Sequence, residues 1–303
     1  DRAGLGFVPA VSVNFSGLEE NPGFKITKEM VYEMANAVIY GDLLMALHNQ
    51  TLPYEKEPGA SQRLVDHFVS MLNDDFAKGE SMGPKAIRKK MDEIVTAFTK
   101  VPVHEKNKVR VGIVGEIYVK FAPLGNNNLE EFLLKENAEP VVPGLLDFIL
   151  YTADTAWEDY KRYGGKLLRP VVTTAVMQIM IGIQKDMIKA MEKPGCFHAP
   201  STFKRTKELA GQVIDHGVKM GEGWLLTGEM MALIDEGVNN IVCTQPFGCL
   251  PNHVCGRGMM RRIKSIHPDA NIVAIDYDAG ATKVNQENRL KLMLATAKKL
   301  QIK

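Results

Sequence analysis

The sequence predicts an α/β protein, with a parallel sheet covered by helices on both faces and a mostly helical N-terminal unit before it. Apolar residues recur at three- and four-residue spacing through the first hundred residues, and short β-branched runs alternate with helical segments after that. Between them, near residue 106, the composition changes to Pro, His, Lys and Asn. We therefore predict two domains, a helical unit over 1–106 and an α/β domain over 107–303.

The helical unit is expected to open with a short strand and then continue as helices. The run VPAVSVNFSGL (8–18) has β-branched residues closed by a turn signal, which indicates a strand followed by a loop. Three helices are then expected over 27–53, about 60–78 and about 84–99, because their apolar residues follow the helical period.

The α/β domain opens with VRVGIVGE (109–116), a continuous apolar run that is typical of a buried parallel strand. Strands are also expected at 139–143, 239–245 and 271–278. Helices are expected at 127–137, from about 153, and at 167–192, 203–217, 228–237, 252–266 and 282–301. This alternation favours a Rossmann-like parallel sheet, in which ligands bind outside the carboxyl ends of the strands.

Charge and hydropathy argue against two classes of partner. Thirty-seven basic and 36 acidic residues give a formal net charge of +1, which provides no overall attraction to nucleic acid or to an anionic membrane. The longest apolar stretch, 170–183, is interrupted by Thr173, Thr174 and Gln178, and it is shorter than the roughly 20 residues that a membrane span needs. We expect no transmembrane helix and no nucleic-acid partner. The chain starts without Met, so we expect its natural N-terminus to lie upstream.

Three of the four cysteines lie within one short segment, VCTQPFGCLPNHVCGRGMM (242–260). We expect Cys243 at the carboxyl end of a strand, Cys249 in the following loop and Cys255 in the first turn of the next helix, where backbone amides favour thiolates. Such crowding is unlike a secreted disulfide framework and favours metal or thiol chemistry in the cytoplasm. Zinc sites usually have closer paired spacings, whereas iron–sulfur clusters accept wider ones. Buried structural cysteines are the alternative.

Four further side chains are expected at the same edge of the sheet. Glu116 follows the first strand of the α/β domain, and Asp276 and Asp278 end the last one. His253 follows the helix cap expected at Asn252 and is suited to donate to a cluster sulfur or a substrate carbonyl. The alternatives are helix capping for the aspartates and a solvated first-turn position for His253.

Long motifs resemble the C-terminal part of the 2-hydroxyacyl-CoA dehydratase superfamily, in the branch whose dehydratase-like component is fused to, or works beside, an activase. They are QPFGCLPNHVCGRGMM, IVAIDYDAGATKVNQENRLKLML, YGDLLMAL, LPYEKEPG and VGIVGEIYVKFAPLGNNNLEEFL. The resemblance implies two Rossmann-like lobes that hold an iron–sulfur cluster between them, an ATP-dependent activase that delivers a low-potential electron, and an acyl-CoA as a possible substrate.

By this resemblance Cys249 is the first candidate ligand and Cys243 the second, with Cys255 a further candidate. The other ligands are expected from an N-terminal lobe outside this chain, and Cys196 has no assigned position. No G-x-x-x-x-G-K-[ST] motif occurs, so the ATP step is expected in the activase. The alternatives are a non-catalytic binding or scaffold domain of the same assembly and, less favoured, a zinc-bound regulatory module.

Overall fold

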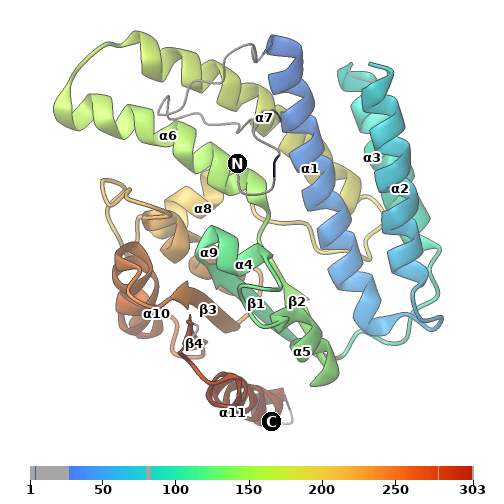
Figure 1. The fold of residues 1–303 in the computed structure, drawn as a ribbon, viewed down its shortest axis with the longest axis vertical. Coiled ribbons are helices and arrows are strands. Elements are labelled where there is room, and N and C mark those ends of the chain that lie inside the picture. Colours follow the sequence, from blue (N-terminus) through green and yellow to red (C-terminus); the bar gives the residue numbers. More distant parts are fainter. Residues whose placement is uncertain (1–3, 5–26, 80–82, 279, 302–303) are drawn as a thin grey trace.

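The computed structural model describes Gly4 and residues 27–79, 83–278 and 280–301, so the strand expected within 8–18 lies outside the described residues. Within this part of the chain a parallel sheet lies beside a layer of long helices (Figure 1). The predicted fold class, α/β with a helical N-terminal unit, is confirmed.

The sheet has four described strands in the order β2-β1-β3-β4, and all neighbouring pairs are parallel. The strands are β1 (Val109–Gly115), β2 (Ala138–Val141), β3 (Asn240–Pro246) and β4 (Asn271–Tyr277). Each coincides with an expected strand to within two residues at either end. The register pairs Val114 with Cys243 and Cys243 with Ala274, so Cys243 lies in the middle of β3 and of the sheet, and the expectation that it lies at the carboxyl end of the strand is wrong.

Alternate strand residues enter two different cores, which explains why the strands are apolar throughout. Val111, Ile113 and Val242 pack with α4 (Ile117–Phe121), α5 (Leu129–Lys135) and α11 (Lys283–Gln301). On the opposite face, Ile241 and Cys243 pack with α8 (Phe203–Ala210), α9 (Trp224–Asp235) and α10 (Met260–Ile266). Helices therefore cover both faces, as predicted.

The helical layer contains the three helices expected before residue 106 and two from the α/β segment. They are α1 (Lys28–Thr51), α2 (Ala60–Ala77), α3 (Pro84–Thr99), α6 (Leu145–Tyr163) and α7 (Leu168–Glu192). All five contribute buried residues to one apolar cluster, together with Trp224 of α9. Residues on the two sides of position 106 thus share a core.

Helix α6 begins at Leu145 rather than near 153, because another helix caps it. Asp42 of α1 accepts the backbone N–H groups of Leu145 and Leu146 at 2.8 and 2.9 Å. A carboxylate at a helix N-terminus satisfies free amides and is stabilised by the helix dipole. A cap from a residue more than a hundred positions away leaves no local sequence signal.

Two other expected helices differ from the structure. The helix expected over 203–217 ends at Ala210, and turns follow as far as Gly223. The segment expected as a helix over 252–266 is divided into a π-helix (Asn252–Gly256), a 3₁₀ turn (Arg257–Met259) and then α10. A π-turn widens the helix where the cysteine loop enters it, and such turns are frequent at functional sites. A further 3₁₀ turn, Leu52–Tyr54, follows α1.

Among the described residues, the helices Glu29–Tyr54 and Leu168–Glu192 are long and apolar enough to cross a membrane. Both contribute buried side chains to the apolar core of the helical layer, which is also what core helices of soluble proteins do. Of the apolar windows in these two helices, 33% and 28% are buried.

Candidate functional site

The carboxyl ends of β1, β3 and β4 meet at one edge of the sheet, and the cysteine loop follows β3 there. Gly115 ends β1 with φ +145°, which favours glycine, and a Cβ at this position would overlap the Thr244 carbonyl. This close approach directs the chain into α4. Glu116 is the N-cap of α4, and its Oε2 accepts the N–H of Val119 at 2.8 Å. Glu116 therefore lies at the expected edge and caps a helix.

Cys249 lies in a tight turn between β3 and the π-helix and is half-buried. Its N–H donates to the Pro246 carbonyl at 3.3 Å, and its own carbonyl accepts the N–H of His253 at 3.0 Å. The Asn252 side-chain amide donates to Cys249 Sγ at 3.2 Å. Amide donors at a sulfur support a thiolate that binds iron. The loop position expected for Cys249 is therefore the observed one, and its role as a ligand stays a prediction.

Asn252 is held by a buried carboxylate, Glu222, in the turn before α9. Asn252 Nδ2 donates to Glu222 Oε2 at 3.2 Å, and the Ile117 N–H at the start of α4 donates to Glu222 Oε1 at 3.1 Å. Glu222 thus joins the cysteine loop to the end of β1. Asn252 Oδ1 is buried and has no hydrogen-bond partner among the described residues, so an acceptor at this edge stays unsatisfied.

His253, Gln245 and Asp276 form a second set of contacts beside the same turn. Gly248 N–H donates to His253 Nε2 at 3.1 Å, while Gln245 Nε2 lies 3.1 Å from His253 Nδ1 and 2.5 Å from Asp276 Oδ1. Arg257 Nη1 lies 3.7 Å from Asp276 Oδ2. We call Glu222, Gln245, Cys249, Asn252, His253 and Asp276 the edge cluster.

The hydrogen bonds of His253 constrain its protons. A neutral imidazole accepts at only one nitrogen, so Gly248 and Gln245 do not both donate to the ring at once. Turning the Gln245 amide over would let its Oε1 accept a hydrogen bond from an Nδ1–H group, but it would also remove the hydrogen bond from Gln245 Nε2 to Asp276 Oδ1. The orientation of the Gln245 amide and the tautomer of His253 are therefore coupled.

Cys243 and Cys255 lie in different surroundings from Cys249, because both are buried. Cys243 packs among apolar residues of the sheet and α9, and a Cβ on Gly256 would lie 2.8 Å from its Sγ. Burial and the nearby Glu229 carboxylate raise the pKa of the Cys243 thiol to about 12. Burial and Glu222 raise the pKa of Cys255 to about 11. Such thiols stay protonated at neutral pH, which opposes metal binding.

These placements test the fit of an iron–sulfur cluster to the chain. A cluster requires three or four ligands, most often thiolates. Among the residues that the structure describes, no group of three or more His, Cys, Asp or Glu side chains is arranged to hold a metal ion. The edge cluster offers one accessible thiol, Cys249. A complete ligand set is therefore absent from the described residues, although a single ligand position fits.

The remaining candidate residues lie apart from the Cys249 turn or have a local partner. Asp278 is exposed and accepts the N–H of Gly280 at 3.3 Å, as expected for a turn residue. Cys196 is exposed in the loop after α7, and its carbonyl accepts a bond from Lys106 Nζ at 3.0 Å. Because Lys106 precedes β1, Cys196 lies toward the amino end of the sheet, away from Cys249.

A second polar cluster lies inside the molecule, between α4, α9 and the helical layer. Lys120 Nζ donates to Glu229 Oε1 at 2.8 Å, and the two side chains are only 1% and 4% exposed. Gln184 Nε2 donates to Asp147 Oδ1 at 2.9 Å. Asp42, Asp147, Gln184 and Glu229 line a cavity of about 80 Å³. We call these four residues and Lys120 the core cluster.

Burial controls the protonation of the core cluster. It raises the pKa of Asp42 to about 6 and that of Asp147 to about 7, and the neighbouring Glu229 carboxylate adds to the shift of Asp147. The pKa of Glu229 is also raised by burial, and the charge of Lys120 opposes that shift. One lysine therefore faces three carboxyl groups, and protonation of the aspartates relieves the excess negative charge.

Sequence reasoning did not single out Glu222, Gln245 or the core cluster. Gln245 carries a weak signal, because a polar residue at the end of an apolar strand run occupies the ligand-binding edge of a parallel sheet. Glu222 lies between two turn glycines, and nothing local marks it as buried. Lys120 and Glu229 lie on different helices, so only their tertiary contact reveals the pair.

No protein-family model, no curated protein and no solved structure matches this chain. The resemblance to the dehydratase superfamily consequently stays a prediction.

Proposed function

We propose that this protein is an iron–sulfur component of an acyl-CoA dehydratase-like or activase-linked reductase system, and that Cys249 is the ligand it contributes to the cluster. The observation that carries the proposal is the half-buried Cys249 thiol at the carboxyl edge of the sheet, with the Asn252 amide donating to its sulfur at 3.2 Å. This edge is the usual ligand-binding position of open α/β sheets.

The proposal assigns the remaining ligands to protein outside the described residues. One thiolate cannot hold a cluster, so a second lobe that carries its own cysteines must face the Cys249 turn. The same reasoning gives the partners: that lobe, an ATP-dependent activase and, as substrate, an acyl-CoA. A reducing cytoplasm suits an oxygen-sensitive cluster and four unpaired cysteines.

When bound, the cluster would supply a low-potential electron to the substrate. The protein side of the site has two tasks in this proposal. Glu222 and Asn252 fix the Cys249 turn to the end of β1 and place an amide donor on the sulfur. His253 and Asp276, which Gln245 joins, would provide the proton donor beside the same turn. Removal of a hydroxyl group needs such a proton at the leaving oxygen.

A second candidate function is a non-catalytic binding or scaffold domain whose cysteines are structural. The deep burial of Cys243 and Cys255 favours it for those two residues, because a buried apolar thiol behaves as a small hydrophobic side chain. The first function requires Cys249 to bind iron, whereas the second does not. The Cys249 side chain is half-buried, between deeply buried and fully exposed.

Metal analysis of the native protein tests these functions. The chain is purified anaerobically from the cells that produce it, together with the proteins that copurify, and iron, acid-labile sulfide and zinc are measured. We expect iron and sulfide in comparable amounts. If the protein contains zinc and no sulfide, it is a zinc-bound regulatory module and the proposal is wrong. Absence of iron, sulfide and zinc from protein kept strictly anaerobic would favour the scaffold domain.

A further inference from the structure

Helix α7 is apolar on two opposite faces, but only one of them is covered in the part of the chain that the structure describes. The inner face, with Met177, Met180 and Met187, is buried in the core of the helical layer. The outer face bears a continuous apolar stripe of Leu168, Val171, Val172, Ala175, Val176, Ile179 and Gly182, all exposed. Leu168 is 73% exposed and Ile179 is 55% exposed.

The spacing of this stripe is that of a helix-packing surface. Its residues follow one another at intervals of three and four over four turns, which is about 21 Å at 1.5 Å per residue. Ala175 and Gly182 are small and three others are valines, so another helix can approach closely. A helix that is apolar all round is normally buried on all sides. The exposed stripe is therefore suited to a partner helix.

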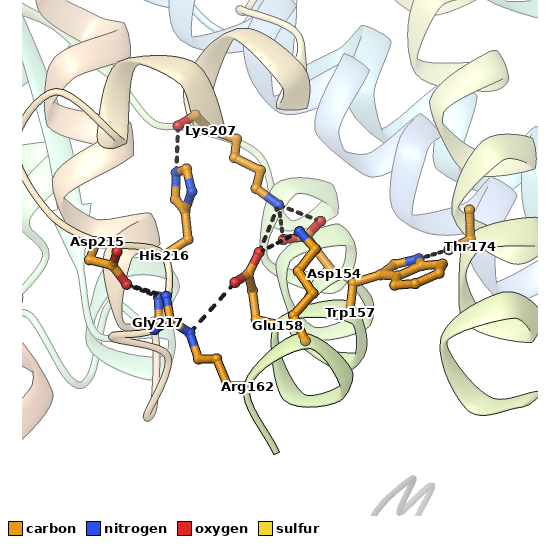
Figure 2. A network of polar contacts seen from close by, with 10 residues as sticks. Asp154, Trp157, Glu158, Arg162, Thr174, Lys207, Asp215, His216 and Gly217 are labelled. Atoms are coloured by element: carbon orange, nitrogen blue, oxygen red, sulfur yellow. Dashed lines mark hydrogen bonds and ion pairs between the residues drawn. The ribbon is translucent and has the colours of Figure 1, made fainter. Parts of the chain in front are cut away.

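Polar contacts link α7 to α6 and α6 to α8. Figure 1 shows α6 and α7 side by side, reaching the edge of the molecule where the two helices join. In Figure 2, Lys207 of α8 contacts Asp154 and Glu158 of α6, and Trp157 of α6 contacts Thr174 of α7.

The charges beside the stripe determine the chemistry of its partner. Lys166 and Arg169 lie at its start and Lys185 follows its end, and all three are exposed. No ion-pair partner for them occurs among the described residues, and the segment 166–185 contains no Asp or Glu. Arg169 and Lys185 are on opposite sides of the stripe, given the 100° rotation per residue. Acidic side chains on both edges of the partner would pair with them.

From these observations we propose that the outer face of α7 docks an amphipathic helix of another protein, with an apolar stripe flanked by glutamates or aspartates. A second copy of this chain is disfavoured, because two such faces would bring only basic residues together. A membrane surface would also attract the three basic residues, but the small Ala175 and Gly182 add little apolar area to a lipid contact, whereas they let a helix approach closely. The inference does not depend on the proposed function.

A pair of synthetic helical peptides tests the proposal. Both are about 24 residues long, with leucine and isoleucine at helical spacing; the flanking positions are glutamate in one and lysine in the other. Fluorescence anisotropy with the full chain at 0.1 M salt measures both affinities. We expect the glutamate peptide to bind at least about tenfold more tightly than the lysine peptide. Equal affinities, or no binding below about 1 mM, would overturn the proposal.

Variants locate the binding surface. The double variant Val172→Gln with Ile179→Gln is expected to lower the affinity for the glutamate peptide by about tenfold or more. The matched control is Leu292→Gln on α11, which is 71% exposed and lies outside the stripe, and it should leave the affinity unchanged. Arg169→Glu with Lys185→Glu should reverse the preference between the peptides. All these positions are exposed, so circular dichroism should report native folding.

Two further outcomes would replace this partner with another. Sedimentation that shows a dimer, lost in the Val172→Gln and Ile179→Gln variant, would make a second copy the occupant. Binding to phosphatidylglycerol vesicles, lost in the same variant and without affinity for the glutamate peptide, would make a lipid surface the occupant. Either result contradicts the proposed helix.

Discussion

The edge cluster and the core cluster are both networks of carboxyl and amide groups, but they differ in accessibility and pairing. In the core cluster the charged Lys120 faces Glu229 at 2.8 Å, and Asp42 accepts two backbone amides. In the edge cluster, two buried amide oxygens, Gln245 Oε1 and Asn252 Oδ1, lack hydrogen-bond partners among the described residues, and the Cys249 thiol is half-buried. The polar groups of the core cluster are paired, which indicates a structural role. The unsatisfied polar groups of the edge cluster indicate a site that binds a ligand.

The comparison also explains why similar chemistry has different consequences at the two places. A carboxyl group surrounded by protein is neutralised by protonation, so Asp147 and Asp42 hold protons well above the usual range of an aspartate. Glu222 is satisfied instead by two N–H donors, from Ile117 and Asn252, and thereby fixes the Cys249 turn. The first arrangement responds to pH, and the second positions a sulfur.

The largest expected effect comes from removing the only lysine of the core cluster. Lys120→Met leaves Glu229 buried without its cation, next to two more carboxyl groups, and should lower the free energy of unfolding by about 3–5 kcal/mol. Urea denaturation measures the change. Lys135→Met, which breaks an exposed pair with Glu131 at 2.6 Å, serves as the control and should change the free energy of unfolding far less. Equal losses in the two variants would remove the distinction between buried and exposed pairs.

The next effect is a pH dependence that arises from Asp147. Because its pKa is raised from 3.8 to about 7 in the folded protein, the folded state binds this proton more tightly. The stabilisation is complete below about pH 4 and is lost as the pH rises through 7. Asp147→Asn removes the ionisation and keeps an acceptor for Gln184. The variant should therefore exceed the wild type in stability by roughly 2–4 kcal/mol at pH 8 and lose this advantage near pH 4. A difference independent of pH would contradict the assignment.

The accessible cysteines and the buried cysteines should differ in their rates of alkylation. In the folded protein with its iron removed, iodoacetamide should alkylate Cys196 and Cys249 more than about 100-fold faster than Cys243 and Cys255, which react only when the surrounding structure opens. Peptide mass spectrometry after short pulses measures the four rates separately. Denatured protein, in which all four should react at comparable rates, provides the control. Fast alkylation of Cys243 in the folded protein would contradict its burial under α9.

Local patterns in the sequence predicted the parallel sheet because each strand is a continuous apolar run between helical segments. They also predicted Cys249 in the loop after β3, since Gly248 and Pro251 mark a turn there. They favoured Cys249 over Cys243 as a ligand but could not show how deeply Cys243 is buried, because that burial depends on α9 and Gly256 packing over the strand. The early start of α6 and the Lys120–Glu229 pair were missed for the same reason, since both depend on contacts between distant segments.

The most direct measurement of the central claim is the iron content of Cys249→Ser. Wild type, Cys249→Ser and the matched control Cys196→Ser are purified anaerobically from the cells that produce the protein, and iron is determined per chain. Serine keeps the size of the side chain and is a poorer ligand for a reduced cluster. We predict that iron falls to less than about half in Cys249→Ser and stays at the wild-type level in Cys196→Ser. Wild-type iron in Cys249→Ser would contradict the assignment of Cys249 as a cluster ligand.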